Sequence, residues 1–305
     1  MPSPGSDRTL IVVEGPTAIG KTALAITLAR QFSTEIISAD SRQFFKEMSI
    51  GTAKPSPEEL ASAPHHFIDS HSIAKLFSTG DFESEALALM EELFKIHQVL
   101  ILVGGSGLYI DAICKGLDEL PQTDLRIREQ LNLQLAAEGL DPIKSQLSQL
   151  DPEYYEKVDQ SNPQRMIRGL EFFLSTGKKL SSFQTNTVKT RPFNILKIGL
   201  NMDRALLYER INLRVDQMMQ QGLLDEVKGL TEYKGQNALN TVGYTELFDH
   251  LDGQISLQEA TDRIKQNTRR FAKRQLTWFR RDEDIHWFEP NQTDAIISFI
   301  KNKIG

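Results

Sequence analysis

The segment TLIVVEGPTAIGKTALA, residues 9–25, constrains the fold of this 305-residue chain more than any other. Its apolar start is typical of a strand. Gly15, Gly20, Lys21 and Thr22 then complete the pattern G-x-x-x-x-G-K-S/T at the start of a helix. Backbone N–H groups of such a loop converge on phosphate oxygens, the lysine adds a positive charge, and the helix dipole favours an anion. The segment therefore predicts a P-loop.

The predicted phosphate cradle is the whole loop and the start of its helix. Its members are Gly15, Pro16, Thr17, Ala18, Ile19, Gly20, Lys21 and Thr22. The hydroxyl of Thr22 is the candidate ligand for Mg²⁺, as in other loops of this pattern.

Strand-like and helix-like segments alternate along the first third of the chain. Strands are expected at residues 10–13, 35–40 and 98–105, a helix at 22–32, and a further strand at 193–201. A continuous apolar run such as VLILV is typical of a central parallel strand with both faces buried. The fold class that we predict is α/β, with a wound parallel sheet flanked by helices.

A helical, polar stretch with Asp-Pro and Asn-Pro helix starts interrupts this pattern. We therefore predict an all-helical insertion at residues 120–192. A P-loop core would comprise residues 8–119 and 193–290, and residues 291–305 a C-terminal helix or tail.

Two long helices are expected in the second half of that core. One begins after Asp203 and runs to about Leu230. The other begins at Ser256, which stands three residues before Glu259 in a capping-box pattern.

Composition narrows the classes of protein. A single cysteine, Cys114, excludes an intramolecular disulfide, and no apolar run has the length of a bilayer-spanning helix. We expect a cytoplasmic protein without a membrane partner. The formal net charge of -6 disfavours a nucleic-acid partner unless local basic clusters override it.

Asp40 is the acidic residue that the pattern places where an acid could face the predicted cradle. P-loop kinases hold Mg²⁺ with an Asp at the end of an apolar strand, but the strand VLILVGG ends in glycines. Asp40 ends the strand EIISAD, where it could organise a metal, act as a base, or simply cap a helix. Glu14, just before the loop, is interpreted as a solvated carboxylate.

The glycines of VGGSGLYIDA follow a strand at the edge where open α/β sheets bind ligands. Gly104 and Gly105 would let the backbone pass close to a ligand that Ser106 could reach. A tight turn without function is the alternative.

Basic residues gather in TRRFAKRQLTWFRR and its approach, with no acidic residue between Arg263 and Arg281. Arg263, Arg270, Arg274 and Arg281 share one helical stripe, and Ile264, Phe271 and Trp278 share another that we expect to pack inward. A polyanion would suit the basic stripe, although a solvated face would also explain it.

Other basic pairs are spaced for the same use. Arg165 and Arg168 stand near a helix start, and Arg126 and Arg128 lie in LRIRE. Arg210 and Arg214 lie one helical turn apart and could neutralise a departing diphosphate. Surface pairing with Glu209 or Asp216 is the alternative.

Several blocks together resemble the bacterial tRNA dimethylallyltransferases of the IPP transferase family. The blocks are GPTAIGKT, ISADSRQFF, IGTAKPSPEE, APHHFID, VGGSGLYIDA, NPQRMIRGLE, YERINLRVDQMMQQGLLDEV, TVGYTEL and TRRFAKRQLTWFRR. They span the chain from Leu10 to about Phe288. Ile19, Phe45 and Ser106 depart from the family's usual serine, tyrosine and threonine.

The resemblance implies an enzyme that moves a dimethylallyl group from dimethylallyl diphosphate to tRNA. The acceptor would be the exocyclic amine of the adenosine just 3′ of the anticodon, flipped into a channel. Asp40 would accept the amine proton, Lys21, Thr22 and Arg214 would steady the diphosphate, and Mg²⁺ would assist its departure.

The implied tRNA contacts lie in both parts of the chain, and the insertion would grip the anticodon stem-loop. They are Asp40, Ser41, Arg42, Gln43, Ser106, Arg128, Gln164, Arg165, Met166, Ile167 and Arg168. To these the basic stripe adds Arg270 and Arg274. No protein partner is implied, so a monomer is expected.

Three other functions remain open on the residues. They are a P-loop kinase of a nucleoside or small metabolite, a nucleotide-switched RNA-binding module, and an adenylate isopentenyltransferase acting on free nucleotide. A kinase would leave the basic helix without a role.

Overall fold

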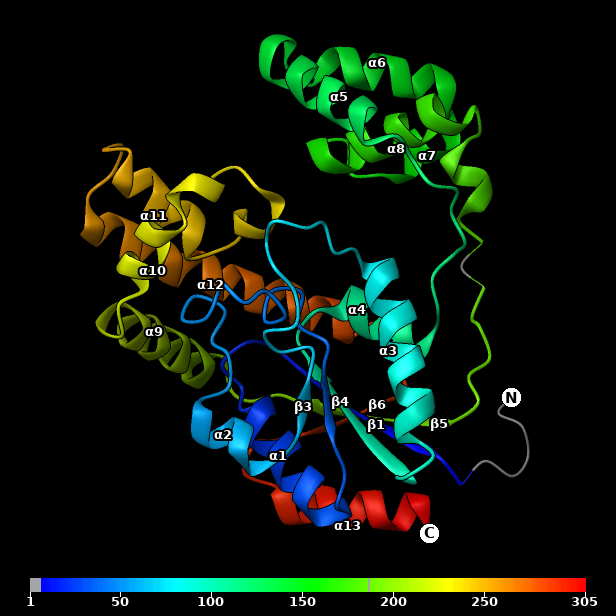
Figure 1. The fold of residues 1–305 in the computed structure, drawn as a ribbon, viewed down its shortest axis with the longest axis vertical. Coiled ribbons are helices and arrows are strands. Elements are labelled where there is room, and N and C mark those ends of the chain that lie inside the picture. Colours follow the sequence, from blue (N-terminus) through cyan, green and yellow to red (C-terminus); the bar gives the residue numbers. More distant parts are fainter. Residues whose placement is uncertain (1–6, 186) are drawn as a thin grey trace. The chain divides into compact units, whose positions relative to one another are not determined.

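A computed structural model describes residues 7–185 and 187–305, which form two compact units. The core unit comprises the chain up to Lys115 and from Thr190 onward, and the helical unit comprises Gly116–Lys189. The core unit contains a parallel sheet with helices on both faces (Figure 1).

The sheet has six strands in the order β3-β2-β4-β1-β5-β6, and every pairing is parallel. The strands are β1 (Thr9–Glu14), β2 (Ile36–Ser38), β3 (His65–His66), β4 (Val99–Gly104), β5 (Asn194–Leu200) and β6 (Ile285–Phe288). The four strands expected from the sequence are confirmed, and the short edge strands β3 and β6 are additional. The wound sheet is what the apolar runs predicted.

The core unit also contains helices that connect and flank these strands. They are α1 (Lys21–Phe32), α2 (Pro57–Ser62), α3 (Thr79–Leu93), α4 (Gly107–Cys114), α9 (Arg204–Gln220), α10 (Leu223–Gly229), α11 (Tyr244–Leu251), α12 (Leu257–Phe279) and α13 (Thr293–Ile304).

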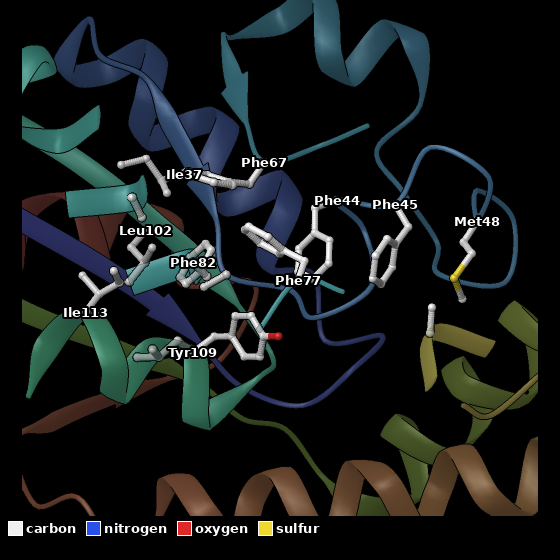
Figure 2. Packing of buried hydrophobic residues seen from close by; sticks show 14 of the residues in the cluster. Ile37, Phe44, Phe45, Met48, Phe67, Phe77, Phe82, Leu102, Tyr109 and Ile113 are labelled. Carbon is white, nitrogen blue, oxygen red and sulfur yellow. The ribbon is translucent and has the colours of Figure 1, made fainter. Parts of the chain in front are cut away.

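The side chains of β1 alternate between two buried layers, as a central strand requires. Leu10 and Val12 belong to the cluster on the α3 and α4 face, whereas Ile11 and Val13 belong to the cluster with α1 and α13. Figure 2 shows the aromatic side chains that pack on the α3 and α4 face. The ring centroids of Phe44 and Phe77 lie 4.8 Å apart, in an edge-to-face arrangement. Burial of these large side chains stabilises the loop that follows β2.

The expected helix from Asp203 to about residue 230 is in fact two helices. α9 ends at Gln220, and Gly222 then adopts a left-handed conformation with φ 100° before α10 begins at Leu223. A residue with a Cβ rarely adopts this conformation, so the glycine sets the break. Asp203 does cap α9, because its side chain accepts from the N–H groups of Ala205 and Leu206.

Ser256 caps α12 as expected, since its hydroxyl accepts from the Glu259 N–H. The Glu259 carboxylate pairs with Arg263 one turn on, so it does not complete the capping box.

The helical unit contains α5 (Leu125–Glu138), α6 (Asp141–Leu150), α7 (Pro152–Lys157) and α8 (Pro163–Thr176). Pro152 and Pro163 stand at helix starts, where a missing N–H costs nothing, and Asp151 and Asn162 supply the caps. The helices enclose an apolar core of their own. Within the described parts of both units, no helix combines the length and apolarity that crossing a bilayer requires.

Candidate active site

The phosphate loop lies between β1 and α1, at the carboxyl edge of the sheet. Gly15 has φ 148°, and a Cβ there would lie 2.7 Å from the backbone oxygen of Leu200, so only glycine fits. Gly20 has φ 105° immediately before the first turn of α1. The loop thus has the strand-loop-helix geometry that binds phosphates at a helix N-terminus.

A cavity of about 490 Å³ opens above this loop and is lined by Thr17, Lys21, Thr22, Arg210 and Arg214. Lys21 Nζ donates to the Pro16 carbonyl at 2.7 Å. Burial, and secondarily the charge of Arg214, lowers the pKa of Lys21 to about 7. Three cationic side chains beside one loop form a site for a strongly charged anion.

Arg214 extends from α9 to the phosphate loop. Its Nη1 donates to Thr17 Oγ1 at 3.5 Å, and its Nη2 to the Ala53 carbonyl at 3.4 Å. Asp216 instead accepts from Lys265, so the alternative of a surface pair between Arg214 and Asp216 is wrong. Burial lowers the pKa of Arg214, because desolvation disfavours the charged guanidinium. A bound anion would favour the charged form again.

Asp40 stands two residues beyond the end of β2, facing the same cavity. Its Oδ1 accepts from the backbone N–H groups of Arg42 and Gln43 at 3.0 and 3.3 Å. Asp40 therefore caps a turn, not the helix start that was one of the alternatives, and it also lines the cavity. Its Oδ2 makes no hydrogen bond with the described part of the chain.

A second cavity, of about 250 Å³, adjoins the first. Both are lined by Thr17, Asp40, Thr52, Ala53, Arg214 and Phe271. The second has an apolar wall of Ile211, Val215, Met218 and Leu223. Asp40 and Arg214 thus lie where a cationic chamber meets an apolar one.

The donors for a metal are few. Among the described residues, no three His, Cys, Asp or Glu side chains are grouped to hold an ion. Thr22 lines the first cavity, and a Mg²⁺ ion that keeps most of its waters and binds phosphate oxygens needs little more from the protein. The site therefore fits such an ion through Thr22.

Glu14 is not the solvated carboxylate expected from the sequence. It is only 2% exposed, and its Oε1 has no hydrogen-bond partner among the described residues. Burial raises its pKa to about 8, against the opposing charge of Lys197. The correction follows from the central position of β1, because both faces of this strand are buried and Glu14 lies on the same face as Leu10 and Val12.

Gly104, the last residue of β4, and Gly105 pack closely against protein atoms. A Cβ on Gly104 would lie 2.3 Å from the Ala39 carbonyl, and one on Gly105 would lie 2.4 Å from Gln275 Nε2. Ser106 accepts from the Ser41 N–H at 3.0 Å and donates to the Ser41 hydroxyl at 3.1 Å. Ser106 therefore anchors the Asp40 loop.

Gln275 is a site residue that the sequence predictions missed. It lies on the buried stripe of α12, three residues after Ala272 and four before Phe279, where a polar side chain is unexpected. That anomaly was the available signal. Its Oε1 accepts from the Thr17 N–H and its Nε2 donates to the Gly105 carbonyl, both at 2.8 Å.

The basic stripe of α12 is exposed at Arg263, Arg270 and Arg274, as expected, whereas Arg281 is exposed but lies beyond the end of the helix at Phe279. The apolar stripe is only partly as predicted, because Ile264 is buried while Phe271 and Trp278 are 38% and 37% exposed. Arg274 lies over Phe271, and Arg281 over Trp278, so these rings support arginines at the surface.

Two predicted tRNA contacts in the helical unit share an internal partner. Arg128 and Arg168 both pair with Glu171, which is fully buried and also accepts from Thr123. Gln164 and Arg165 are exposed in the first turn of α8.

The expectation that Met166 and Ile167 contact tRNA does not hold for their side chains. Both are buried in the core of the helical unit, at 0% and 1% exposure. Nearer the cavities, Gln43 donates to the Thr52 and Ala53 carbonyls, and Arg42 to the Ser41 and Asn237 carbonyls.

The fold and site together define a P-loop enzyme, with a cationic phosphate chamber and a carboxylate at its junction with an apolar chamber. A sequence model described as IPP transferase matches residues 43–282. The chain belongs to the IPP transferase family.

Relatives match nearly the full length of this chain. It is 54% identical over 297 residues to the tRNA dimethylallyltransferase of Christiangramia forsetii, which covers 97% of this chain and 98% of the relative. The crystal structure of the tRNA isopentenylpyrophosphate transferase of Bacillus halodurans matches with a TM-score of 0.72 at 37% identity, covering 97% of each chain. A eukaryotic dimethylallyltransferase acting on tRNA matches with a TM-score of 0.75 at 29% identity, over 93% of this chain and 74% of that one.

Proposed function

We propose that this protein transfers a dimethylallyl group from dimethylallyl diphosphate to the exocyclic amine of the adenosine just 3′ of a tRNA anticodon. The observation that carries the proposal is the junction of the two cavities at Asp40 and Arg214. A donor with a diphosphate head and a short apolar tail matches a cationic chamber that opens into an apolar one.

The phosphate loop and its cations would hold the leaving group. The N–H groups at the start of α1, with Lys21, Arg210 and Arg214, line the first cavity and would stabilise the charge that grows as the carbon–oxygen bond breaks. Mg²⁺ held through Thr22 and the diphosphate oxygens would neutralise further charge on the leaving group. Enclosure by apolar side chains would keep water from the allylic carbon.

Asp40 would serve the acceptor. The amine nitrogen forms a bond to the allylic carbon, the carbon–oxygen bond to diphosphate breaks, and the amine proton passes to the Asp40 carboxylate. Oδ1 accepts from two backbone N–H groups, so Oδ2 would be the oxygen that takes the proton. The strands and turn around Asp40 hold it for this role.

The tRNA would contact exposed arginines. Arg270 and Arg274 on α12, and Gln164 and Arg165 at the start of α8, are exposed and suit a phosphate backbone. Ser41, Arg42, Gln43, Ser106, Arg128 and Arg168 would act chiefly by holding loops and helices in place. We also propose that the protein acts as a monomer, and the tRNA substrate supports a cytoplasmic location.

The test offers labelled dimethylallyl diphosphate with three acceptors: an unmodified tRNA transcript, AMP, or a nucleoside together with ATP. Label in tRNA alone supports the proposal, and phosphorylation of the nucleoside would replace it with a kinase. Asp40→Asn should abolish transfer while tRNA binding persists. Asp225→Asn, at a side chain 81% exposed on α10, is the matched control.

A further inference from the structure

Gln275 connects two loops. One is the phosphate loop, which would hold the leaving group, and the other is the turn after β4, which supports the loop of Asp40. The amide oxygen of Gln275 accepts from the N–H of Thr17 in the phosphate loop, and its amide nitrogen donates to the carbonyl of Gly105 after β4. Both bonds measure 2.8 Å, and the residue is 7% exposed. An amide is the side chain that can accept and donate at once in this geometry.

The connection continues from Gly105 to Asp40. Ser106, the next residue, holds the Ser41 N–H through its hydroxyl at 3.0 Å, and Ser41 is adjacent to Asp40. Hydrogen bonds and backbone links therefore connect the phosphate loop, Gln275, the turn after β4 and the loop that carries Asp40. We propose that Gln275 is a positioning residue that sets the diphosphate cradle in register with Asp40.

The packing around Gln275 leaves little freedom. A Cβ on Gly105 would lie 2.4 Å from Gln275 Nε2, so the two residues fit closely. The same Cβ would lie 3.6 Å from Lys21 Nζ, so Gln275 and the P-loop lysine both approach Gly105. α12 also carries exposed Arg270 and Arg274, so one helix holds the cradle and presents the basic stripe.

This inference rests on the proposed transferase function, and the test separates the two. Gln275→Met keeps the length of the side chain but removes both hydrogen bonds. We expect its single-turnover transfer to fall about tenfold to hundredfold, as misplacement of reacting groups does. The loss should fall on kcat rather than on tRNA affinity. Gln258→Met, on the exposed face of the same helix, is the matched control and should behave as wild type.

Gln275→Glu supplies a readout that a purely structural role would not give. Its carboxylate can accept from Thr17 but cannot donate to Gly105, whereas the protonated acid can do both. Relative to wild type, transfer by this variant should therefore recover as the pH is lowered, while the ratio for Gln275→Met stays flat.

Either of two results would overturn the positioning role: wild-type kcat in Gln275→Met, or parallel pH profiles for the two variants. Inactivity of the wild-type protein with tRNA would contradict the proposed function instead. Circular dichroism and a cooperative melt establish that each variant is folded, and rates are compared per folded molecule.

Discussion

Arg214 on α9 donates to the Thr17 hydroxyl of the phosphate loop, 197 residues away in the chain. The contact joins the helix after β5 to the loop after β1, and it brings a buried guanidinium to the point where the two cavities meet. Because Thr17 also donates its N–H to Gln275, one loop residue receives support from two long helices. Function in this site depends on contacts between segments that are distant in sequence.

Arg214→Ala should lower the transfer rate by about 10²–10³, the usual cost of removing one preorganised donor to a developing anion. Arg214→Lys should retain part of the rate, because a point charge replaces the two-pronged donor. Steady-state kinetics with tRNA in excess measure both. Arg204→Ala, at the exposed start of the same helix, is the control and should leave the rate unchanged. An active Arg214→Ala variant would remove this residue from the leaving-group site.

Donor binding should take up a proton above neutral pH. The pKa of Lys21 is about 7 in the free protein, and a bound diphosphate would raise it because the anion favours the charged ammonium. We expect uptake approaching one proton at pH 8 and almost none at pH 6. Titration calorimetry in buffers of different ionisation enthalpy counts the protons. Lys21→Met should bind more weakly without this uptake, and a wild-type value of zero at pH 8 would contradict the prediction.

Glu14 should make stability depend on pH. Its folded pKa of about 8 lies above the ordinary value of 4.5, so the folded state binds more protons between these values. The free energy of unfolding should therefore fall as pH rises from about 4.5 to about 8. Glu14→Gln should remove this pH dependence. At pH 9 the variant should be more stable than the wild type by a few kcal/mol, because each unit of pKa shift corresponds to about 1.4 kcal/mol. Urea unfolding at several pH values tests it.

Glu91→Gln, at an exposed position of α3, is the control for that series. Its unfolding free energy should follow the wild-type pH curve. A Glu14→Gln curve with the wild-type slope would show that Glu14 is already ionised in the folded state.

The basic stripe of α12 should contribute to the salt dependence of tRNA binding. For each phosphate contact that is lost, the slope of log K against log salt falls by a little less than one. We expect Arg270→Ala with Arg274→Ala to reduce the slope by between one and two. Lys301→Ala with Lys303→Ala removes two exposed charges from α13 and should not change it. Equal slopes for both double variants would assign the tRNA to another face.

Local patterns predicted the elements that carry their own signal. The strand-loop-helix segment located the P-loop, and buried runs located β1, β2, β4 and β5. The edge strands β3 and β6 have two and four residues, too few for a periodic signal. The break at Gly222 was missed because the apolar pattern continues across it, whereas the left-handed glycine acts through the backbone.

Tertiary contacts decided the rest of the site. Nothing near Arg214 in sequence shows that it meets Thr17 rather than Asp216. A carboxylate at the end of a strand is usually solvated, and the sequence does not show which element covers Glu14. Met166 and Ile167 share a segment with Arg165, but the helical period turns them inward.

In the proposed function, the phosphate loop holds a leaving group attached to carbon. The most direct test of this proposal is the ratio of diphosphate released to dimethylallyl groups incorporated into tRNA in a single turnover. We predict one diphosphate for each group incorporated, with ATP left intact when it replaces the donor. Hydrolysis or transfer of the terminal phosphate of ATP, without alkylation of tRNA, would contradict the account.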